Sequence, residues 1–241
     1  MRTTTDIIIP ILNEEDTLET NVGIIVEFIE KKLSDKYHCR VVLADNGSTD
    51  NTPEIAKRLV GQYAGTVLYQ RVSRRGVGLA LKTSWQLSDA QLVGYMDLDM
   101  ATDLRHLPEA FDALVNKGAD IVYGSRLHKK STVIGRTLKR EITSRVFNYI
   151  VKMYLRTHFS DGMCGFKFLK KEYVTSIMQS GAESDGWFFC TEILVVAEWM
   201  GLSLYELPVD WTDDPNSKVK IGVLAREYLS AMRLLKSKRV S

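Results

Sequence analysis

Short apolar runs alternate with longer amphipathic segments through the first half of the chain. The runs are rich in Ile, Val and Leu, and most end near Pro, Asn, Asp or Gly, a pattern typical of buried strands that lead into loops. The predicted strands are Asp6–Ile11, Arg40–Ala44, Thr66–Gln70, Leu92–Met96 and Asp120–Tyr123. Apolar residues at helical spacing predict helices over Glu15–Leu33, from about Thr52, over Val77–Leu87 and over Leu104–Val115.

Strands that alternate with helices predict an α/β fold, in which a mostly parallel sheet carries helices on both faces. Sheets of this kind bind ligands just beyond the carboxyl ends of their strands. The loops that follow the predicted strands are therefore the places where functional side chains are expected.

The second half of the chain has a different pattern. Val133–Leu155 is long, basic and rich in apolar residues, and it reads as one helical stretch. The elements predicted after it are a strand at Gly165–Leu169, a helix near Glu192–Trp199, a strand at Ser203–Leu207 and a basic helix after Lys218. We find no internal repeat and no Gly/Ser-rich linker, so we expect a single domain over residues 1–241.

Two carboxylates stand one residue apart in Met96-Asp97-Leu98-Asp99, directly after a predicted strand. At a strand end, both can turn toward one cation. Oxygen ligands of this kind suit Mg²⁺ or Mn²⁺, which take their remaining ligands from water and phosphates. Such a metal neutralises the charge that develops on a diphosphate leaving group. An isolated pair of this spacing is common in surface loops, and its place after an apolar strand is what favours a metal site.

Two other polar loops follow predicted strands. The first contains Pro10, Asn13 and Glu14, and the second runs from Asp45 to Thr52. Acidic and amide side chains at the carboxyl ends of the strands can bind a ribose or a base, as a carboxylate does in dinucleotide-binding folds. Either loop could instead serve only to cap the helix that follows it.

The charged residues are unevenly distributed, although the net charge is only +2. Residues 1–125 carry 13 Lys/Arg against 18 Asp/Glu, whereas residues 126–156 carry 9 Lys/Arg against 1 Glu, a net charge of +8. A basic block of this kind indicates an anionic partner. A solvated helix face would show the same pattern, so both interpretations stay open.

The remaining sequence features bear on location. The three cysteines, Cys39, Cys164 and Cys190, are far apart, which predicts reduced thiols and neither a disulfide framework nor a zinc site. No signal-peptide pattern precedes the first predicted strand, and no apolar run reaches the ~18 residues that cross a bilayer. We therefore expect a cytoplasmic protein that is soluble or peripheral to the membrane.

Several motifs in order resemble the family-2 glycosyltransferases of GT-A fold. They are Pro-Ile-Leu-Asn-Glu at 10–14, Leu-Ala-Asp-Asn-Gly-Ser-Thr-Asp at 43–50, Arg-Arg-Gly-Val-Gly-Leu-Ala at 74–80 and Met-Asp-Leu-Asp at 96–99. The continuation is similar to the polyprenyl-phosphate sugar synthases, with Gly124-Ser125-Arg126, Asp161-Gly-Met-Cys-Gly165-Phe166-Lys167 and Pro208-Val209-Asp210-Trp211 through Ser217-Lys218. The resemblance covers nearly the whole chain and lies closest to dolichyl-phosphate glucosyl- and mannosyltransferases.

The resemblance implies a role for each matching position. Residues 1–125 would form the half that binds a UDP- or GDP-hexose, and residues 126–241 the half that binds a polyprenyl phosphate, dolichyl or undecaprenyl. The nucleoside would be lined by Pro10, Asn13, Glu14 and Asp45, and the metal and diphosphate would be held by Asp97 and Asp99. Arg126, with Lys167 or Lys218, would contact the acceptor phosphate. No nucleic-acid partner is expected.

One position departs from the resembling family. Mannosyl members often carry Gln two residues after the second Asp of the metal motif, and this chain has Ala101 there. The departure favours a glucosyl donor, or a metal whose remaining ligands are water.

The acceptor decides whether the enzyme needs a general base. A hydroxyl must lose its proton to attack, whereas a phosphate monoester is already ionised at neutral pH. The basic block suits a phosphate acceptor. The alternative is a soluble glycosyltransferase that acts on a sugar or protein hydroxyl, with Glu192 or Asp103 as its base.

The stretch Val133–Leu155 allows two interpretations. Its apolar residues recur at steps of four, as in Leu138, Ile142, Val146 and Ile150, and its basic residues do not gather on one face. It could be an ordinary core helix. It could also be an interfacial helix whose Lys and Arg side chains reach anionic headgroups, which would place the protein at the cytoplasmic membrane face.

Overall fold

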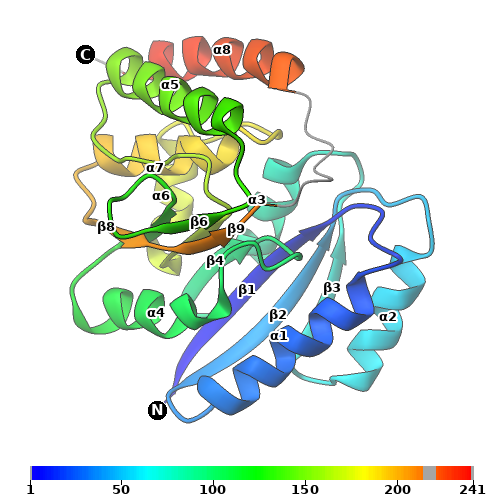
Figure 1. The fold of residues 1–241 in the computed structure, drawn as a ribbon. Helices are drawn as coiled ribbons and strands as arrows, with labels where there is room; N and C mark the ends of the chain where they lie inside the picture. Colours follow the sequence, from blue (N-terminus) through cyan, green and yellow to red (C-terminus); the bar gives the residue numbers. More distant parts are fainter. Residues whose placement is uncertain (1, 214–220, 240–241) are drawn as a thin grey trace.

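The computed structural model describes residues 2–213 and 221–239. These residues form a seven-stranded sheet in the order β3-β2-β1-β4-β7-β5-β8 and a two-stranded sheet of β6 and β9 (Figure 1). The strands are β1 Thr3–Ile11, β2 Tyr37–Asp45, β3 Val67–Arg71, β4 Leu92–Met96, β5 Ile121–Ser125, β6 Thr132–Ile134, β7 Phe166–Lys170, β8 Leu204–Pro208 and β9 Asp210–Thr212. The helices are α1 Leu18–Lys32, α2 Thr52–Gln62, α3 Val77–Leu87, α4 Leu107–Asn116, α5 Leu138–Leu155, α6 Val174–Gln179, α7 Phe189–Trp199 and α8 Ile221–Lys238, with 3-10 turns η1 Leu104–His106 and η2 Lys171–Tyr173.

The large sheet is parallel except at one strand. β7 pairs antiparallel with β4 on one side and with β5 on the other, whereas the other pairs in the sheet are parallel. The predicted mostly parallel sheet is therefore confirmed. The reversal matters for function, because it brings the beginning of β7 to the edge where β4 and β5 end.

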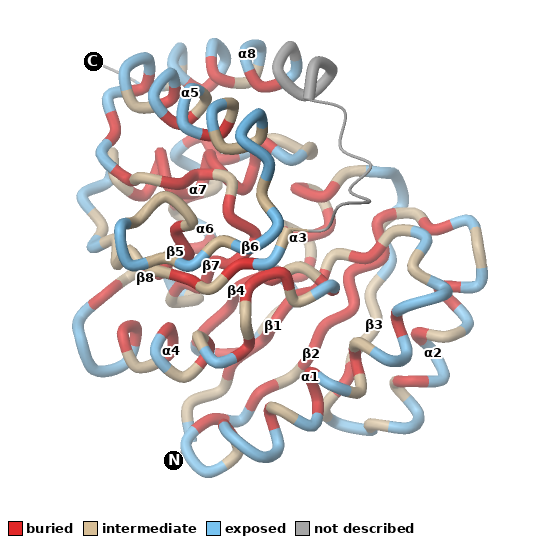
Figure 2. Tube along the Cα trace, in the orientation of Figure 1, coloured by how far each residue is buried: buried red, intermediate tan, exposed pale blue. Residues whose placement is uncertain are grey.

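Helices cover both faces of the sheet, and each face has its own hydrophobic core. Helices α1, α2 and α4 contribute to one core, and α3, α5, α6, α7 and α8 contribute to the other. Ile7 and Ile9 of β1 point into the first core and Ile8 into the second, and all three are fully buried. A strand that is buried on both faces has no polar side to show, which explains its continuous apolar sequence. Figure 2 shows the buried central strands.

Helices α5 and α8 lie side by side over α7, which separates them from the sheet (Figure 1). The ring of Tyr228 on α8 connects them to the layer below, because it lies 5.2 Å from the ring of Phe147 on α5 and 5.4 Å from that of Phe188 at the start of α7. The basic helix predicted after Lys218 corresponds to α8.

The stretch Val133–Leu155 is not one helix, and this prediction was wrong. Its first residues belong to β6, Gly135 follows with a φ of 76°, and α5 begins at Leu138 after the N-cap Thr137. A left-handed residue ends the strand and turns the chain into the helix, which apolar periodicity alone does not reveal. The short elements β6, β9 and α6 were also not predicted.

Candidate functional site

The loops after β1, β2 and β4 meet at one edge of the sheet, as the sequence predicted. β1 is parallel to both β2 and β4, and Ile11 pairs with Asp45 at the ends of β1 and β2. Because β7 runs in the opposite direction, its first residue, Phe166, pairs with Met96, the last residue of β4. The edge therefore places Asp97 beside the segment that enters β7.

Asp97 lies directly against Gly165. A Cβ atom added to Gly165 would lie 1.8 Å from Oδ2 of Asp97 and 2.5 Å from its Cγ. No other residue type fits here without moving the carboxylate or the strand. Gly165 was part of the motif that carried the family resemblance, but the sequence showed no reason for a glycine at this position.

The Asp97 carboxylate is unusually hard to ionise. Burial and the neighbouring charge of Asp99 raise its pKa to about 7, against the opposing effect of Arg126 and Lys167. Asp99 is more exposed, and its Oδ1 accepts a hydrogen bond of 3.0 Å from the backbone N–H of Ala101. Two carboxylates that repel each other in this way form a site that a cation would stabilise.

The donor set fits Mg²⁺ or Mn²⁺ that is shared with a phosphorylated ligand. The residues that the structure describes contain no group of three or more His, Cys, Asp or Glu side chains placed to enclose a metal ion. Two hard oxygen donors with further ligands from diphosphate and water are the usual arrangement for these ions. Asp97 and Asp99 are the residues that would hold the metal.

The raised pKa of Asp97 predicts how metal binding depends on pH. The folded protein keeps a proton on Asp97 that the unfolded chain has already released, so between about pH 4 and pH 7 this group lowers the free energy of unfolding as the pH rises. A metal must displace that proton. We therefore expect Mn²⁺ to raise the melting temperature strongly at about pH 7.5 and weakly at about pH 5.5. An equal effect of Mn²⁺ at both pH values would show that Asp97 does not bind it.

Arg126 pairs with a buried carboxylate. Its Nε and Nη2 donate to Asp161 at 2.8 Å and 2.9 Å, its backbone N–H donates at 3.1 Å, and its guanidinium lies 4.8 Å from the ring centre of Trp211. Burial alone would raise the pKa of Asp161, but Arg126 reverses that effect and holds it at about 2. The contact between Arg126 and an acceptor phosphate stays a prediction, and it would use the remaining N–H groups.

Lys167 is fully buried beneath the same edge. Its Nζ donates to the backbone carbonyl of Cys164 at 2.5 Å and to the Tyr95 hydroxyl at 3.2 Å, and burial lowers its pKa. Its ammonium therefore compensates Asp97 from below and fixes the segment before β7. In this position it does not reach the surface, so its predicted contact with an acceptor phosphate would require a rearrangement. Lys218, the other predicted contact, lies outside the described residues.

The predicted nucleoside loop after β2 is held by Asp45. Oδ1 of Asp45 accepts hydrogen bonds from the backbone N–H groups of Gly47 at 3.0 Å and Ser48 at 2.7 Å, and Oδ2 accepts from the Tyr69 hydroxyl at 2.6 Å. Asp45 is fully buried. These bonds shape the loop, so a contact of Asp45 with a nucleoside stays a prediction.

The loop after β1 is joined to the loop after β2. Oδ1 of Asn13 accepts from the backbone N–H of Thr49 at 2.8 Å, and the backbone N–H of Glu14 donates to the Thr52 hydroxyl at 2.8 Å. Asn13 is exposed, with a φ of 56°, whereas Glu14 and Pro10 are partly buried. The structure thus brings the four predicted nucleoside residues to one rim, and their ligand stays a prediction.

Asn46, next to Asp45, connects this rim to α3, a role that the sequence did not indicate. Its side-chain oxygen accepts a hydrogen bond from the backbone N–H of Gly76, at the start of α3. Cβ atoms added to Gly76 and Gly78 would lie 2.6 Å and 2.3 Å from backbone oxygens of the loop that contains Asp185 and Ser184. The two glycines therefore let α3 pack closely against that loop.

Neither candidate base is placed well to accept a proton from a hydroxyl. Hydrogen bonds from Arg105 hold the pKa of Asp103 below its usual range. Burial raises the pKa of Glu192, but the carboxylate is almost fully buried and accepts from the backbone and the hydroxyl of Ser184 at 2.8 Å and 2.7 Å.

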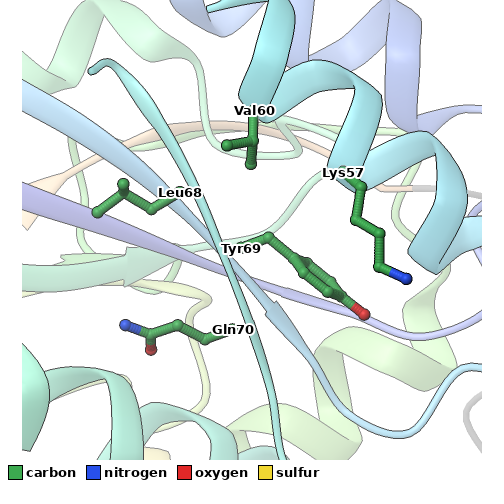
Figure 3. Close-up of a pocket in the computed structure, with 5 residues that line it drawn as sticks. All are labelled: Lys57, Val60, Leu68, Tyr69 and Gln70. Atoms are coloured by element: carbon green, nitrogen blue, oxygen red, sulfur yellow. The ribbon is translucent and has the colours of Figure 1, made fainter. Parts of the chain in front are cut away.

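Two surface pockets differ in their relation to this edge. One pocket is lined in part by Met100 and Asp103, which come just after Asp99 in the chain, and by Trp211. The other borders the edge strand β3 and is lined by Lys57, Val60, Leu68, Tyr69 and Gln70 (Figure 3). Strands β2 and β1 separate β3 from β4, so only the first pocket adjoins the predicted metal site.

Comparison with known proteins agrees with this geometry. The family model for Glycosyl transferase family 2 matches residues 6–177. Glycosyltransferase AglD of Haloferax volcanii is 34% identical over 216 residues, which are 89% of this chain and 34% of that protein. A dolichyl-phosphate beta-glucosyltransferase of Trichomonas vaginalis is 24% identical over 238 residues, which cover 95% of this chain and 70% of that protein. The chain thus spans about a third of the length of the first relative.

Among solved structures, the fold is similar to that of glucosyl-3-phosphoglycerate synthase from Mycobacterium tuberculosis. The complex of that enzyme with Mn²⁺, UDP-glucose and phosphoglyceric acid has a TM-score of 0.66 at 17% identity, over 99% of this chain and 82% of that one. At this identity the likeness shows the fold alone, and it confirms the predicted α/β architecture of GT-A type.

Proposed function

The chain belongs to glycosyl transferase family 2, and on that premise we propose that it transfers a hexose, with inversion, from a UDP- or GDP-sugar to a dolichyl or undecaprenyl phosphate, with Mg²⁺ or Mn²⁺. The observation that carries the proposal is the Asp97–Asp99 pair at the end of β4, which lies against Gly165 and near the cations Lys167 and Arg126. This arrangement suits a ligand whose diphosphate brings negative charge to the edge.

The residues would divide the work as follows. Asp97 and Asp99 would hold the metal, which supplies charge neutralisation to the leaving diphosphate. Gly165 keeps the Asp97 carboxylate in position, and Lys167 limits the cost of burying it. Placing charge and aligning the reacting groups both contribute to catalysis, so the buried residues beneath the carboxylates support the reaction by holding them in place.

The bonds made by the two candidate bases, Asp103 and Glu192, support a phosphate acceptor. A phosphate monoester attacks without first losing a proton, so Asp103 and Glu192 can keep the structural bonds that they make. The dolichyl-phosphate beta-glucosyltransferase among the relatives supports this choice, and Ala101 favours a glucosyl donor. A hydroxyl acceptor would require one of these carboxylates to be released.

The direct test is a transfer assay with defined acceptors. The purified chain would be incubated with UDP-glucose or GDP-mannose, Mn²⁺, and either a short-chain polyprenyl phosphate, the matching polyprenol or a water-soluble sugar, and the products identified by mass spectrometry. We expect a glycosylated polyprenyl phosphate and no product from the polyprenol. Transfer to the soluble sugar alone would refute the acceptor half of the proposal.

We further propose that the protein binds the surface of a membrane through α5. No helix within the described residues is both long and apolar enough to cross a bilayer. Instead, α5 buries Ser144, Asn148, Val151 and Leu155 and exposes an apolar stripe. The stripe consists of Leu138, Ile142, Val146, Tyr149, Ile150 and Met153, between 41% and 82% exposed. An exposed apolar face on a helix from the basic block is typical of interfacial helices.

Vesicle binding would test this surface. We expect the protein to co-sediment with anionic vesicles more than with neutral ones and to be released by salt, because each nearby cation gains about 1 kcal/mol at an anionic surface. The double variant Ile142→Gln/Met153→Gln should bind roughly tenfold less, because apolar area no longer enters the interface. Leu87→Gln on α3, where the side chain is 67% exposed, is the matched control and should bind normally. Equal binding by both variants would exclude α5 as the contact.

A further inference from the structure

Arg136 is a buried cation with unpaired donors. Its side chain is only 9% exposed, and its Nε and Nη1 have no hydrogen-bond partner among the described residues. Oε2 of Glu141 lies 3.3 Å from Nε, yet it is not aligned to accept that hydrogen. Buried guanidinium groups are normally fully paired because an unpaired buried donor is costly. Two unpaired N–H groups on one buried arginine indicate a place for an anion.

None of the described carboxylates near Arg136 accepts a hydrogen bond from its Nε or Nη1. Burial, followed by the positive charge of Arg126, lowers the pKa of Arg136 despite the nearby carboxylates. Those carboxylates are Glu141, Asp161 and Asp213. Oδ1 of Asp213 accepts from Trp211, and its Oδ2 accepts no hydrogen bond from Arg136 or from any other described residue. Asp161 binds Arg126, and Glu141 also accepts from Nε of Arg145 at 2.6 Å.

The position of Arg136 in the fold suggests what the anion is. The residue directly precedes Thr137, the N-cap of the 18-residue helix α5. The amino end of a helix attracts phosphate through its free N–H groups and its dipole. The exposed apolar stripe of α5 begins at Leu138, two residues further along. A ligand bound here would meet cationic donors at its head and an apolar surface beyond it.

We propose that Arg136 binds the phosphate of an amphiphilic phosphate monoester, with the start of α5 beside the phosphate and the stripe from Leu138 along the apolar tail. The proposal rests on the proposed function, since it assigns the acceptor phosphate to a residue that the family resemblance did not indicate. It also gives the acceptor phosphate a donor other than Lys167, whose ammonium is fully buried.

The test is direct binding of farnesyl phosphate to the full chain, measured by calorimetry without vesicles. We expect Arg136→Gln to weaken binding about 10- to 100-fold, the usual effect of losing a charge-assisted contact. Arg145→Gln is the matched control. Arg145 also pairs with Glu141 and carries the same charge as Arg136, but its side chain is 59% exposed. Its affinity should stay within about twofold of that of the unaltered chain.

A melting experiment separates binding from a merely structural role. Without ligand, Arg136→Gln should melt close to the unaltered chain, because the substitution removes two unpaired buried donors and Glu141 keeps its bond to Arg145. Farnesyl phosphate should then raise the melting temperature of the unaltered chain and not that of the variant. A variant that melts lower yet still binds farnesyl phosphate normally would overturn the proposal. Inorganic phosphate that binds as tightly as farnesyl phosphate would overturn the assignment of an apolar tail.

Failure of the proposed function would look different. Farnesyl phosphate that binds through Arg136 but receives no hexose would refute the acceptor and leave the Arg136 site standing. Farnesyl phosphate that is glycosylated equally by the unaltered chain and by Arg136→Gln, with equal affinity, would refute the Arg136 site and leave the proposed function standing.

Discussion

Asp97→Ala and Asp99→Ala should each lower the rate of hexose transfer by about 100- to 1,000-fold or more, the usual cost of removing a group that stabilises charge in the transition state. Both variants should also lose metal-dependent nucleotide binding. The fold should survive both substitutions, because burial disfavours the charged form of Asp97 and Asp99 is exposed. Steady-state transfer rates and calorimetric titration of nucleotide with and without Mn²⁺ would measure both effects.

Asp35→Ala provides the control for these substitutions. Asp35 is exposed and lies just before β2, at the opposite edge of the parallel strands from Asp97. Its replacement should leave transfer and Mn²⁺-dependent binding unchanged. If both Asp97→Ala and Asp99→Ala retained near-normal turnover, the carboxylate pair would not be the metal site.

Gly165→Ala should reduce transfer by roughly two orders of magnitude although it adds a single methyl group. The added carbon would lie 1.8 Å from Oδ2 of Asp97, so either the carboxylate or the start of β7 must move. A displacement of about 1 Å at a reacting centre can cost about 100-fold in rate. Mn²⁺ affinity should fall with the rate, and a Mn²⁺ titration followed by electron paramagnetic resonance would show this.

Gly61→Ala is the matched control for that substitution. Gly61 lies in α2, is exposed, and an added Cβ would meet nothing within 4 Å. Alanine is the better helix former by roughly 0.5–1 kcal/mol, so this variant should be slightly more stable and fully active. Unchanged Mn²⁺ affinity in Gly165→Ala would mean that the contact with Asp97 does not position the metal ligand.

The sequence by itself determined most elements of the first half and the place of the metal motif. Strands buried on both faces leave continuous apolar runs, so Leu92–Met96 was predicted with the bounds that β4 has, and Val77–Leu87 with those of α3. Parallel strands end at one edge, so the meeting of the loops at Asn13, Asp45 and Asp97 also followed from the sequence. These features depend on local periodicity and on one rule of topology.

Only the tertiary structure decided which charges pair with which. Arg126 reaches Asp161 across 35 residues, and Lys167 reaches Tyr95 across 72, because β7 lies between β4 and β5 in reverse direction. The family resemblance assigned Arg126, with Lys167 or Lys218, to an acceptor phosphate, and that assignment stays a prediction. Residue type shows the charge of a side chain but not what surrounds it. Burial and partners depend on strand order, and strand order is not encoded in any short segment.

The same distinction applies to α5 and Arg136. The apolar steps of four residues were visible in the sequence, but a periodic stripe reads alike whether a core or a lipid surface covers it. The structure turned Ser144 and Asn148 inward and left Leu138 and Ile142 outside. Arg136 looked like one more residue of a basic block. That two of its buried N–H groups lack a hydrogen-bond partner became visible only once β6, α5 and their neighbours were folded together. Charge and periodicity are properties of the sequence. Desolvation, which raises the free energy of a buried charge and shifts its pKa, exists only in the packed molecule.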